Sequence, residues 1–429
     1  MAAPGEVIRL LSVTATVRLT ARTERFEGDA PLLYASPANP TAFLRGDEGL
    51  VGIGETLRLE FSGASRFTDA AQAWEDLLTE ATVHDELRLP GTGLVAFGSF
   101  AFDASSRHQS VLVIPQIVIG EAAGERWLTR ITLDAEDSSS PAQALLESRP
   151  IEETRVELSG GRISRAAYEG EVAAALEQIR AGAVSKLVVA RDLVGQLPAG
   201  ADVRSVVREL RRRYPTAMAY AVDGVLGASP ETLVRAREGR FFTRVLAGTQ
   251  ARGATAALDA AAAEELASSQ KNVIEHGMAV DSAMISLRSS GLIPEPGEMF
   301  TLQLPNLWHL ATDLTGDLAG VSTLRVLDAL HPTAALGGTP TPAAMDLIRR
   351  IEGIDRGRYG APVGWIDDRG NATWAIALRG AEISSSGSIR AFAGAGIVEG
   401  SDSAAELRET DIKFRPIRDA FADPLPSDG

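Results

Sequence analysis

The sequence predicts a mixed α/β (α+β) fold, arranged either as two domains or as one large domain with two lobes. The chain has 429 residues, of which 45% are hydrophobic, and a single compact core rarely grows beyond about 250–300 residues. Strand-like apolar runs dominate residues 1–150, whereas helical periodicity and buried-type strands alternate from Ser164 onwards. This change divides the chain into an N-terminal β-rich lobe, residues 1–150, and a second region, residues 164–418.

Residues 1–150 carry mostly strand signals. Segments rich in Val, Ile and Phe predict strands at residues 50–55, 58–62, 94–103, 111–121 and 127–133. The first two segments follow each other closely and predict a hairpin. Residues 68–82 place Ala71, Trp74 and Leu78 on one face, which predicts an amphipathic helix. The polar segment 134–150 contains Ser and Pro and predicts a linker.

Helices and strands alternate in the second region. Tyr168, Val172 and Leu176 follow one another at helical spacing and predict an amphipathic helix. The apolar run from Lys186 to Arg191 predicts a buried strand with a charge at each end. Further helices are expected at residues 202–213, 261–287 and 324–330, and further strands at residues 217–222, 232–237, 241–246, 308–312, 363–367 and 373–379, with residues 227–231 as a turn.

The composition excludes several classes of function. The formal net charge is −15, and nucleic-acid binding needs a basic face, so no nucleic-acid partner is expected. The absence of cysteine excludes disulfides, thiolate metal sites and a cysteine nucleophile. No apolar run approaches the ~20 residues that span a bilayer, and the N-terminus lacks a basic segment followed by a long apolar one. We therefore expect a cytoplasmic protein without a membrane partner.

Lysine is rare among the basic residues. Of 42 lysines and arginines, the lysines are Lys186, Lys271 and Lys413. A lysine can lose its proton when its pKa is lowered, whereas arginine effectively cannot. A retained lysine therefore marks a position where a guanidinium would not serve, and chance survival is the alternative for any one of the three.

Residues 391–414 combine glycines with a charged segment. A strand is expected at residues 391–393. Gly394, Gly396 and Gly400 are expected to break that strand and to let backbone N–H groups approach a ligand closely. The glycines thus predict a binding turn.

The charged segment that follows predicts a helix. Ser401 and Asp402 offer N-caps for a helix that begins just after them. Glu406, Glu409 and Lys413 then share one face of that helix. Two carboxylates and an amine on one stripe suggest a site. A solvated, salt-bridged helix face is the alternative, and this stretch alone leaves both open.

Glu275 is a candidate metal ligand. It lies mid-helix on the same face as Asn272, and the local pattern is not H-E-x-x-H, so a zinc site is not expected. Oxygen ligands from Glu275 and from the C-terminal helix would suit Mg²⁺, which typically takes one or two carboxylates and completes its shell with water and substrate. An exposed helical glutamate is the structural alternative for this residue alone.

Glu231 and Lys186 are candidates for proton transfer. Glu231 follows Pro230 in a turn-like segment, and a carboxylic acid in an apolar pocket can stay protonated and act as a general acid. Lys186 opens an apolar strand, and a desolvated amine has a lowered pKa that suits a general base. Arg379 could bind a carboxylate bidentately, with the Tyr359 hydroxyl nearby. The structural alternative for Glu231 is a carboxylate at the start of a strand or helix, and that for Lys186 is a lysine at the edge of the strand with its amine in solvent.

Ten short motifs occur in order along the second region, namely KLVVAR, GASPE, LAGT, IEH, LWHLAT, HPTAALGG, YGAPVGW, IALR, AGAGIV and ELRETDIK. Over residues 164–418 the chain resembles the chorismate-utilising enzymes, the family of isochorismate, salicylate, anthranilate and aminodeoxychorismate synthases. The N-terminal lobe matches in general character. The resemblance implies one large domain of two stacked, mostly antiparallel sheets with helices outside, and a site in the C-terminal part.

The resemblance also implies roles for individual residues. Lys186 would be the base that activates water, and Glu231 the acid that protonates the departing C4 hydroxyl. The cofactor would be Mg²⁺, held by Glu275 and Glu409 with Glu406 beside it. The substrate chorismate would be bound by Arg379, Tyr359, Gly394 and Gly396 at the enolpyruvyl carboxylate, by Lys413 at the ring carboxylate, and by Gly248, Thr249, His309 and Ala335 along the ring.

Interconversion of chorismate and isochorismate, without release of pyruvate, is the leading expected activity. Ala247 stands where aminodeoxychorismate synthases that form a covalent intermediate carry lysine, so water is the available nucleophile. Ala335 stands where salicylate and anthranilate synthases tend to carry threonine, and a methyl group cannot hydrogen-bond as a hydroxyl can. Salicylate synthase, anthranilate synthase component I and a catalytically silent chorismate-binding homologue are the alternatives.

Three further expectations follow from the resemblance. The product would feed menaquinone or siderophore synthesis, which the sequence does not distinguish. The chain is expected to be a monomer, and it contains no glutaminase domain that could deliver ammonia. Asn272 stands where many family members carry an acidic residue, so the number of carboxylates beside the metal stays open.

Overall fold

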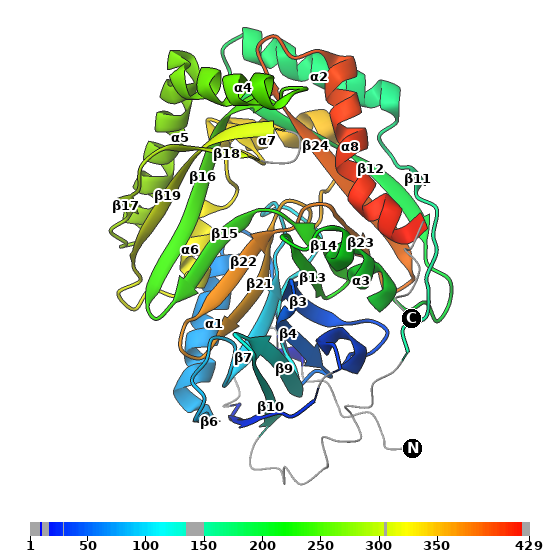
Figure 1. Cartoon of the computed structure of the whole chain (residues 1–429), viewed down its shortest axis with the longest axis vertical. Coiled ribbons are helices and arrows are strands. Elements are labelled where there is room, and N and C mark those ends of the chain that lie inside the picture. The colour runs from blue at the N-terminus through cyan, green and yellow to red at the C-terminus, as the bar shows by residue number, and fades with distance from the viewer. Residues whose placement is uncertain (1–8, 11–16, 29, 134–149, 304–306, 423–429) are drawn as a thin grey trace.

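Two large β-sheets stack on each other and carry the helices on their outer sides (Figure 1). This architecture comes from a computed structural model that describes residues 9–10, 17–28, 30–133, 150–303 and 307–422. The predicted α/β fold of two stacked, mostly antiparallel sheets with helices outside is confirmed. The predicted linker, residues 134–150, falls almost entirely outside the described residues.

Within the residues that the structure describes, the first sheet has 11 strands. Its strands lie in the spatial order β1 (Arg9–Leu10), β5 (Leu57–Phe61), β8 (Ser110–Ile114), β7 (Val95–Ser99), β21 (Pro362–Asp367), β22 (Ala372–Ile376), β15 (Thr232–Arg237), β16 (Arg240–Ala251), β19 (Leu307–Asp317) and β17 (Glu295–Pro296), with β18 (Phe300–Gln303) also paired to β19. Apart from the parallel pair β1–β5, these neighbours are antiparallel.

The second sheet has 13 strands in the described part of the chain. Their spatial order is β11 (Ser159–Gly160), β12 (Lys186–Gln196), β24 (Ser388–Val398), β23 (Gly380–Ile383), β14 (Val225–Ser229), β13 (Met218–Val222), β3 (Thr41–Arg45), β4 (Glu48–Ile53), β9 (Ile117–Ala122), β10 (Glu125–Leu133), β2 (Leu19–Arg25) and β6 (Thr82–His84), with β20 (Gly338–Thr339) also paired to β12. Here β2 and β6 form the parallel pair.

The core forms two layers because side chains alternate along each strand of the second sheet. Phe43 and Leu50 belong to the core between the two sheets, whereas their neighbours Ala42, Leu44 and Val51 belong to a second core on the opposite face. That second core is closed by helices at the outer side of the sheet. Both faces of the 13-stranded sheet are therefore buried.

Eight α-helices and one short 3₁₀ helix are present in the described residues. They are η1 (Leu32–Ala35), α1 (Arg66–Glu80), α2 (Arg165–Arg180), α3 (Arg204–Arg213), α4 (Ala256–Ser268), α5 (Gln270–Ser289), α6 (Thr323–Leu330), α7 (Thr341–Glu352) and α8 (Ser403–Ala422). Helices α2, α7 and α8 pack on β12 or β24, and α4 and α5 pack on β16 and β19. None of the helices described is both long enough and apolar enough to cross a membrane.

Strands from both halves of the chain share both sheets. In the first sheet Val95 of β7 pairs with Asp367 of β21. In the second sheet Leu44 of β3 pairs with Ala219 of β13. The N-terminal lobe therefore has no sheet of its own, and its strands extend those that carry the second region.

Two strand predictions in the N-terminal lobe are wrong. The predicted hairpin of residues 50–55 and 58–62 does not form, because β4 belongs to the 13-stranded sheet and β5 to the 11-stranded sheet. The predicted strand 111–121 is likewise two strands, β8 and β9, in different sheets. The chain passes from one sheet to the other between β4 and β5 and again between β8 and β9. These two connections lie side by side, since the Thr56 N–H donates to the Ile114 carbonyl at 2.8 Å. An apolar run does not reveal that the chain changes sheets within it.

The predicted single helix 261–287 is also wrong. The chain forms α4 and α5 instead, separated at Ser269, whose backbone is extended at φ −67° and ψ 106°. The Ser269 hydroxyl accepts a hydrogen bond from the Asn272 N–H at 3.4 Å and caps α5. A serine side chain that bonds nearby backbone competes with helix continuation. No helix was predicted at residues 341–352, where α7 forms.

Two predicted turns are strands instead. Residues 227–229 belong to β14, which pairs with β13 and β23, so only Pro230 and Glu231 connect it to β15. Gly394 and Gly396 lie inside β24 and do not break it. Gly400, with a φ of 88°, provides the turn before α8. The helices predicted at 68–82, from Tyr168 onwards, at 202–213, at 324–330 and just after Asp402 are confirmed as α1, α2, α3, α6 and α8.

Candidate active site

One cavity gathers the residues that the sequence singled out. Its volume is about 1310 Å³, and its lining includes every predicted site residue except Thr249: Lys186, Glu231, Gly248, Glu275, His309, Ala335, Tyr359, Arg379, Gly394, Gly396, Glu406, Glu409 and Lys413. Thr249 lies in β16 opposite His309, and its side chain is outside the description. The lining comes from both sheets and from α5 and α8, so the cavity lies where the two sheets and these helices meet.

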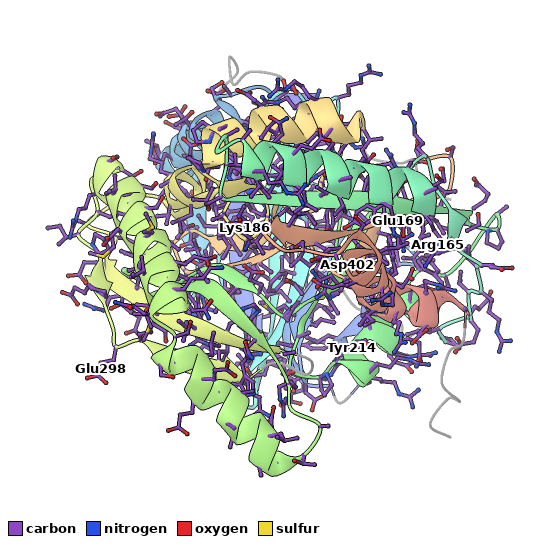
Figure 2. All side chains as sticks on the ribbon, turned by 90° about the horizontal axis from the view of Figure 1, so that it is seen from above. Arg165, Glu169, Lys186, Tyr214, Glu298 and Asp402 are labelled. Atoms are coloured by element: carbon purple, nitrogen blue, oxygen red, sulfur yellow. The ribbon has the colours of Figure 1, made fainter. Side chains whose placement is uncertain are left out.

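Lys186 is the first residue of β12, and β24 runs beside it. In this antiparallel pair Val188 lies opposite Gly396 and Lys186 opposite Val398. A Cβ placed on Gly396 would lie 2.9 Å from Cε of Lys186. The missing side chain at Gly396 therefore leaves the space that the lysine occupies. Viewed from above, Lys186 lies between α5 and α8 (Figure 2).

Replacing Gly396 by alanine is expected to displace the Lys186 amine while leaving the fold intact. The contact falls on the flexible end of a side chain, so the strand can keep its path. If Lys186 is catalytic, kcat falls severalfold or more, while the thermal unfolding midpoint shifts by only a few degrees. The matched control is Gly170→Ala in α2, where a new Cβ meets nothing within 4 Å. Wild-type kcat in Gly396→Ala would show that this packing does not matter.

The environment of Lys186 lowers its pKa below the usual 10.5. Burial is the largest cause, and the positive charge of Lys413 acts in the same direction, while Glu275 and Glu231 act against it. Burial disfavours the charged form of an amine. A larger share of neutral amine is thus available than an exposed lysine would offer, which suits a proton acceptor.

The environment of Glu231 raises the pKa of its carboxyl group. Burial raises its pKa above the usual 4.5, and the positive charges of Arg379, Lys186 and Lys413 only partly offset this. The backbone is held locally, because the Glu231 N–H donates to Ser229 Oγ at 3.2 Å and its carbonyl accepts from the Ile376 N–H at 3.1 Å. One cavity therefore holds a candidate acid and a candidate base with opposing pKa shifts.

Arg379 reaches the cavity from an unusual backbone. It lies between β22 and β23 with a φ of 53°, in the left-handed region that non-glycine residues rarely adopt. Such strain persists where the surroundings fix it, and it concentrates at functional sites. Tyr359 lies beside this segment and stacks on Phe392, with ring centroids 5.3 Å apart and planes inclined by 19°. The predicted carboxylate-binding pair thus lies on rigid supports.

Helix α8 presents its predicted charged face to the cavity. The Asp402 carboxylate caps the helix by accepting from the Ala405 N–H at 2.8 Å. The Lys413 Nζ lies 2.6 Å from Glu409 Oε1 and donates to the Gly394 carbonyl at 2.8 Å. The carboxylate of Glu406 accepts from Ser401 Oγ at 2.7 Å. These contacts hold the acidic face against β24.

The donor set fits a magnesium ion that is completed by substrate and water. Glu275, Glu406 and Glu409 supply hard oxygen atoms to one cavity from two helices. Burial raises the pKa of Glu406, and the negative charge of Glu409 acts in the same direction. The hydrogen bond from Ser401 lowers that pKa and offsets part of the effect. A nearby cation would relieve that repulsion. The described residues contain no preformed group of three ligands, and Mg²⁺ commonly takes only one or two carboxylates.

The predicted ring pocket is formed by a bulge in β16. The register between β16 and β19 shifts between Ala247 and Thr249, where Gly248 adopts a φ of 74°. The His309 Nδ1–H donates to the Gly248 carbonyl at 3.2 Å. Burial lowers the pKa of His309, which favours the neutral imidazole. Asn272 lines the same cavity.

Sequence reasoning missed two supporting residues. Phe392 stacks on Tyr359, and Ser401 binds the carboxylate of Glu406 and not the end of the helix. Phe392 precedes Gly394 by two positions, so strand alternation would have placed it on the same face. No local signal distinguishes a capping serine from one that binds a carboxylate five residues later.

Comparisons with known proteins agree with this site. A family model described as chorismate binding enzyme matches residues 31–422. The salicylate biosynthesis isochorismate synthase of Pseudomonas aeruginosa is 33% identical over 400 residues, 86% of this chain and 82% of that protein. Isochorismate synthase MenF of Bacillus subtilis is 29% identical over 403 residues, 87% of this chain and 85% of that protein.

A solved structure shares the fold. The menaquinone-specific isochorismate synthase MenF from Escherichia coli superposes with a TM-score of 0.76 at 23% identity, covering 95% of both chains. This likeness concerns the fold, which the sequence resemblance had implied. Because the family model extends over nearly the whole described chain, this protein belongs to the chorismate binding enzymes.

Proposed function

We propose that this protein is an isochorismate synthase, an isomerase that interconverts chorismate and isochorismate. The observation that carries the proposal is the single cavity in which Lys186 and Glu231 have opposing pKa shifts. The names of the relatives from Pseudomonas aeruginosa and Bacillus subtilis support the same activity.

The proposed reaction needs one base and one acid. The neutral amine of Lys186 would take a proton from water, whose oxygen then bonds to C2 of the ring. The protonated carboxyl of Glu231 would give its proton to the C4 hydroxyl, which leaves as water while the ring double bonds shift. One water is added and one is lost, so the reaction is an isomerisation and needs no oxidant.

The cavity would bind a dianionic substrate through its cations. Arg379 and Tyr359 would hold the enolpyruvyl carboxylate, and Lys413 would face the ring carboxylate. Glu275, Glu406 and Glu409 would hold Mg²⁺, which when bound supplies positive charge at the ring carboxylate. Neutral His309 would contact the ring without adding charge.

Water addition without elimination is supported by two small residues. Ala247 and Ala335 both line the cavity. An alanine at 247 offers no amine to attack C2, and an alanine at 335 offers no hydroxyl to direct loss of the enolpyruvyl group. Both positions therefore favour isochorismate as the final product.

The product of the purified protein with chorismate and Mg²⁺ tests the proposal. We expect a mixture of chorismate and isochorismate by chromatography, because the reaction is close to thermoneutral, and no pyruvate in a coupled lactate dehydrogenase assay. Stoichiometric pyruvate with salicylate would identify a salicylate synthase, and ammonia-dependent anthranilate would identify an anthranilate synthase. The pathway served, the cytoplasmic location and the monomeric state stay predictions.

A further inference from the structure

The entrance of the cavity carries positive charge that none of the proposed catalytic roles uses. Four charged residues line the cavity and are also exposed to solvent: Arg45, Arg235, Lys271 and Glu399. Three of them are cations, although the whole chain has 57 acidic and 42 basic residues. The charge balance at the entrance is thus the reverse of that of the chain. We call Arg45, Arg235 and Lys271 the entrance cations.

The entrance cations come from three separate elements. Arg45 ends β3 in the 13-stranded sheet, Arg235 lies in β15 of the 11-stranded sheet, and Lys271 is the second residue of α5. Their convergence on one opening therefore depends on the tertiary fold and not on a local charge run. It also includes the remaining lysine, so all three lysines of the chain line this cavity.

The entrance cations differ from the neighbouring Arg244. The guanidinium of Arg244 forms a bidentate pair with Asp313, at 2.5 and 2.8 Å, and is neutralised. Arg235 instead lies 4.9 Å from the centroid of the Phe242 ring, a cation–π contact that orients a guanidinium without cancelling its charge. Within the described residues, no carboxylate lies within ion-pair distance of Arg235, Arg45 or Lys271.

The cavity has room for an outer binding position. Its volume of about 1310 Å³ exceeds the ~300–1,000 Å³ common for sites that enclose one small ligand. The residues proposed for catalysis are partly buried, whereas the entrance cations are exposed. A ligand at the entrance would therefore meet these cations before it reached Lys186 and Glu231.

We propose that Arg45, Arg235 and Lys271 form an entry site that attracts and transiently holds a small dicarboxylate on its way to the inner cavity. This inference rests on the proposed function, in which the substrate is the dianion chorismate. A cleft lined by charge of one sign concentrates field lines and raises the local concentration of an oppositely charged ligand. An acidic protein gains most from such an arrangement, because its remaining surface repels the substrate.

The test compares two triple variants with the same change in net charge. One is Arg45→Gln/Arg235→Gln/Lys271→Gln. The control is Arg22→Gln/Arg107→Gln/Arg162→Gln, which changes three exposed arginines outside the cavity. KM and kcat for chorismate are measured with Mg²⁺ fixed at saturation, from low salt to 0.5 M NaCl.

We expect the KM of the entrance variant to rise about tenfold at low salt, with kcat within about twofold of wild type. The difference should shrink towards wild type at 0.5 M NaCl, because exposed charges are screened over a few ångströms at high salt. The control variant should keep the wild-type KM. Equal KM values for both variants at every salt concentration, with an active wild type, would overturn the entry site alone. A wild type that does not convert chorismate would overturn the proposed function and this inference with it.

Discussion

Replacing Lys186 by alanine is expected to lower kcat by about 10²–10⁴-fold, the usual contribution of a general acid or base. Lys186→Arg should lose as much, because a guanidinium keeps its proton. The side chain is partly exposed to the cavity and forms no described salt bridge, so both variants should unfold at nearly the wild-type temperature. An active Lys186→Arg would mean that the lysine is structural and that the base lies elsewhere.

The pH profile provides an independent readout of the same pair. In the proposed mechanism the amine of Lys186 must be neutral, so activity should rise with pH through the lowered pKa of that amine. The same mechanism needs a protonated Glu231, so activity should fall with pH through the raised pKa of its carboxyl group. Glu231→Gln should lose most of its turnover. The activity that remains should no longer decline at high pH. A residual activity with an unchanged high-pH limb would assign that limb to another group.

Removal of divalent metal is the second change with a large expected effect. Excess EDTA should abolish turnover, and added Mg²⁺ should restore it, because in the proposed function Glu275, Glu406 and Glu409, which line the cavity, hold the Mg²⁺ that offsets the charge of the substrate. Full activity in excess EDTA would rule out the metal role. Binding should also be visible without turnover, since a ligand at 100 times its Kd stabilises the native state by about 2.7 kcal/mol.

Glu275→Gln should weaken this metal binding without unfolding the protein. The thermal shift produced by Mg²⁺ should move to higher concentrations, while the midpoint without metal stays near that of the wild type. Glu298→Gln is the matched control, because this exposed carboxylate lies at the outer edge of the molecule, away from Lys186 (Figure 2). Equal magnesium shifts in the two variants would remove Glu275 from the ligand set.

Local chemistry explains which parts of the fold could be predicted. Helix α2 has Ser164 as its cap and an apolar stripe that includes Tyr168 and Val172, and α8 has Asp402 as its cap. These signals lie within a few residues of the elements they define. The predicted site residues that line the cavity could be named for a similar reason, because each lies in a short motif of the second region.

Long-range pairing explains what could not be predicted. Pro115 and Gln116 interrupt the apolar residues of 111–121, but the strand partners decide that β8 joins one sheet and β9 the other. Glycine residues usually weaken a strand. Gly394 and Gly396 nevertheless stay in β24, because they pair with residues of β12. The entrance cations were invisible for the same reason, since Arg45 and Lys271 are far apart in sequence and line one cavity only in the folded chain.

The sharing of both sheets by the two halves of the chain governs the order in which the protein can be assembled. When β7 emerges from the ribosome, its neighbour β21 has not been synthesised, and β3 must wait for β13. The early strands therefore present unpaired edges to other chains, and closing such distant contacts is slow. The nascent N-terminal half therefore keeps these edges open until the second half is made, and the cavity can form only after α8, which lines it, has been released.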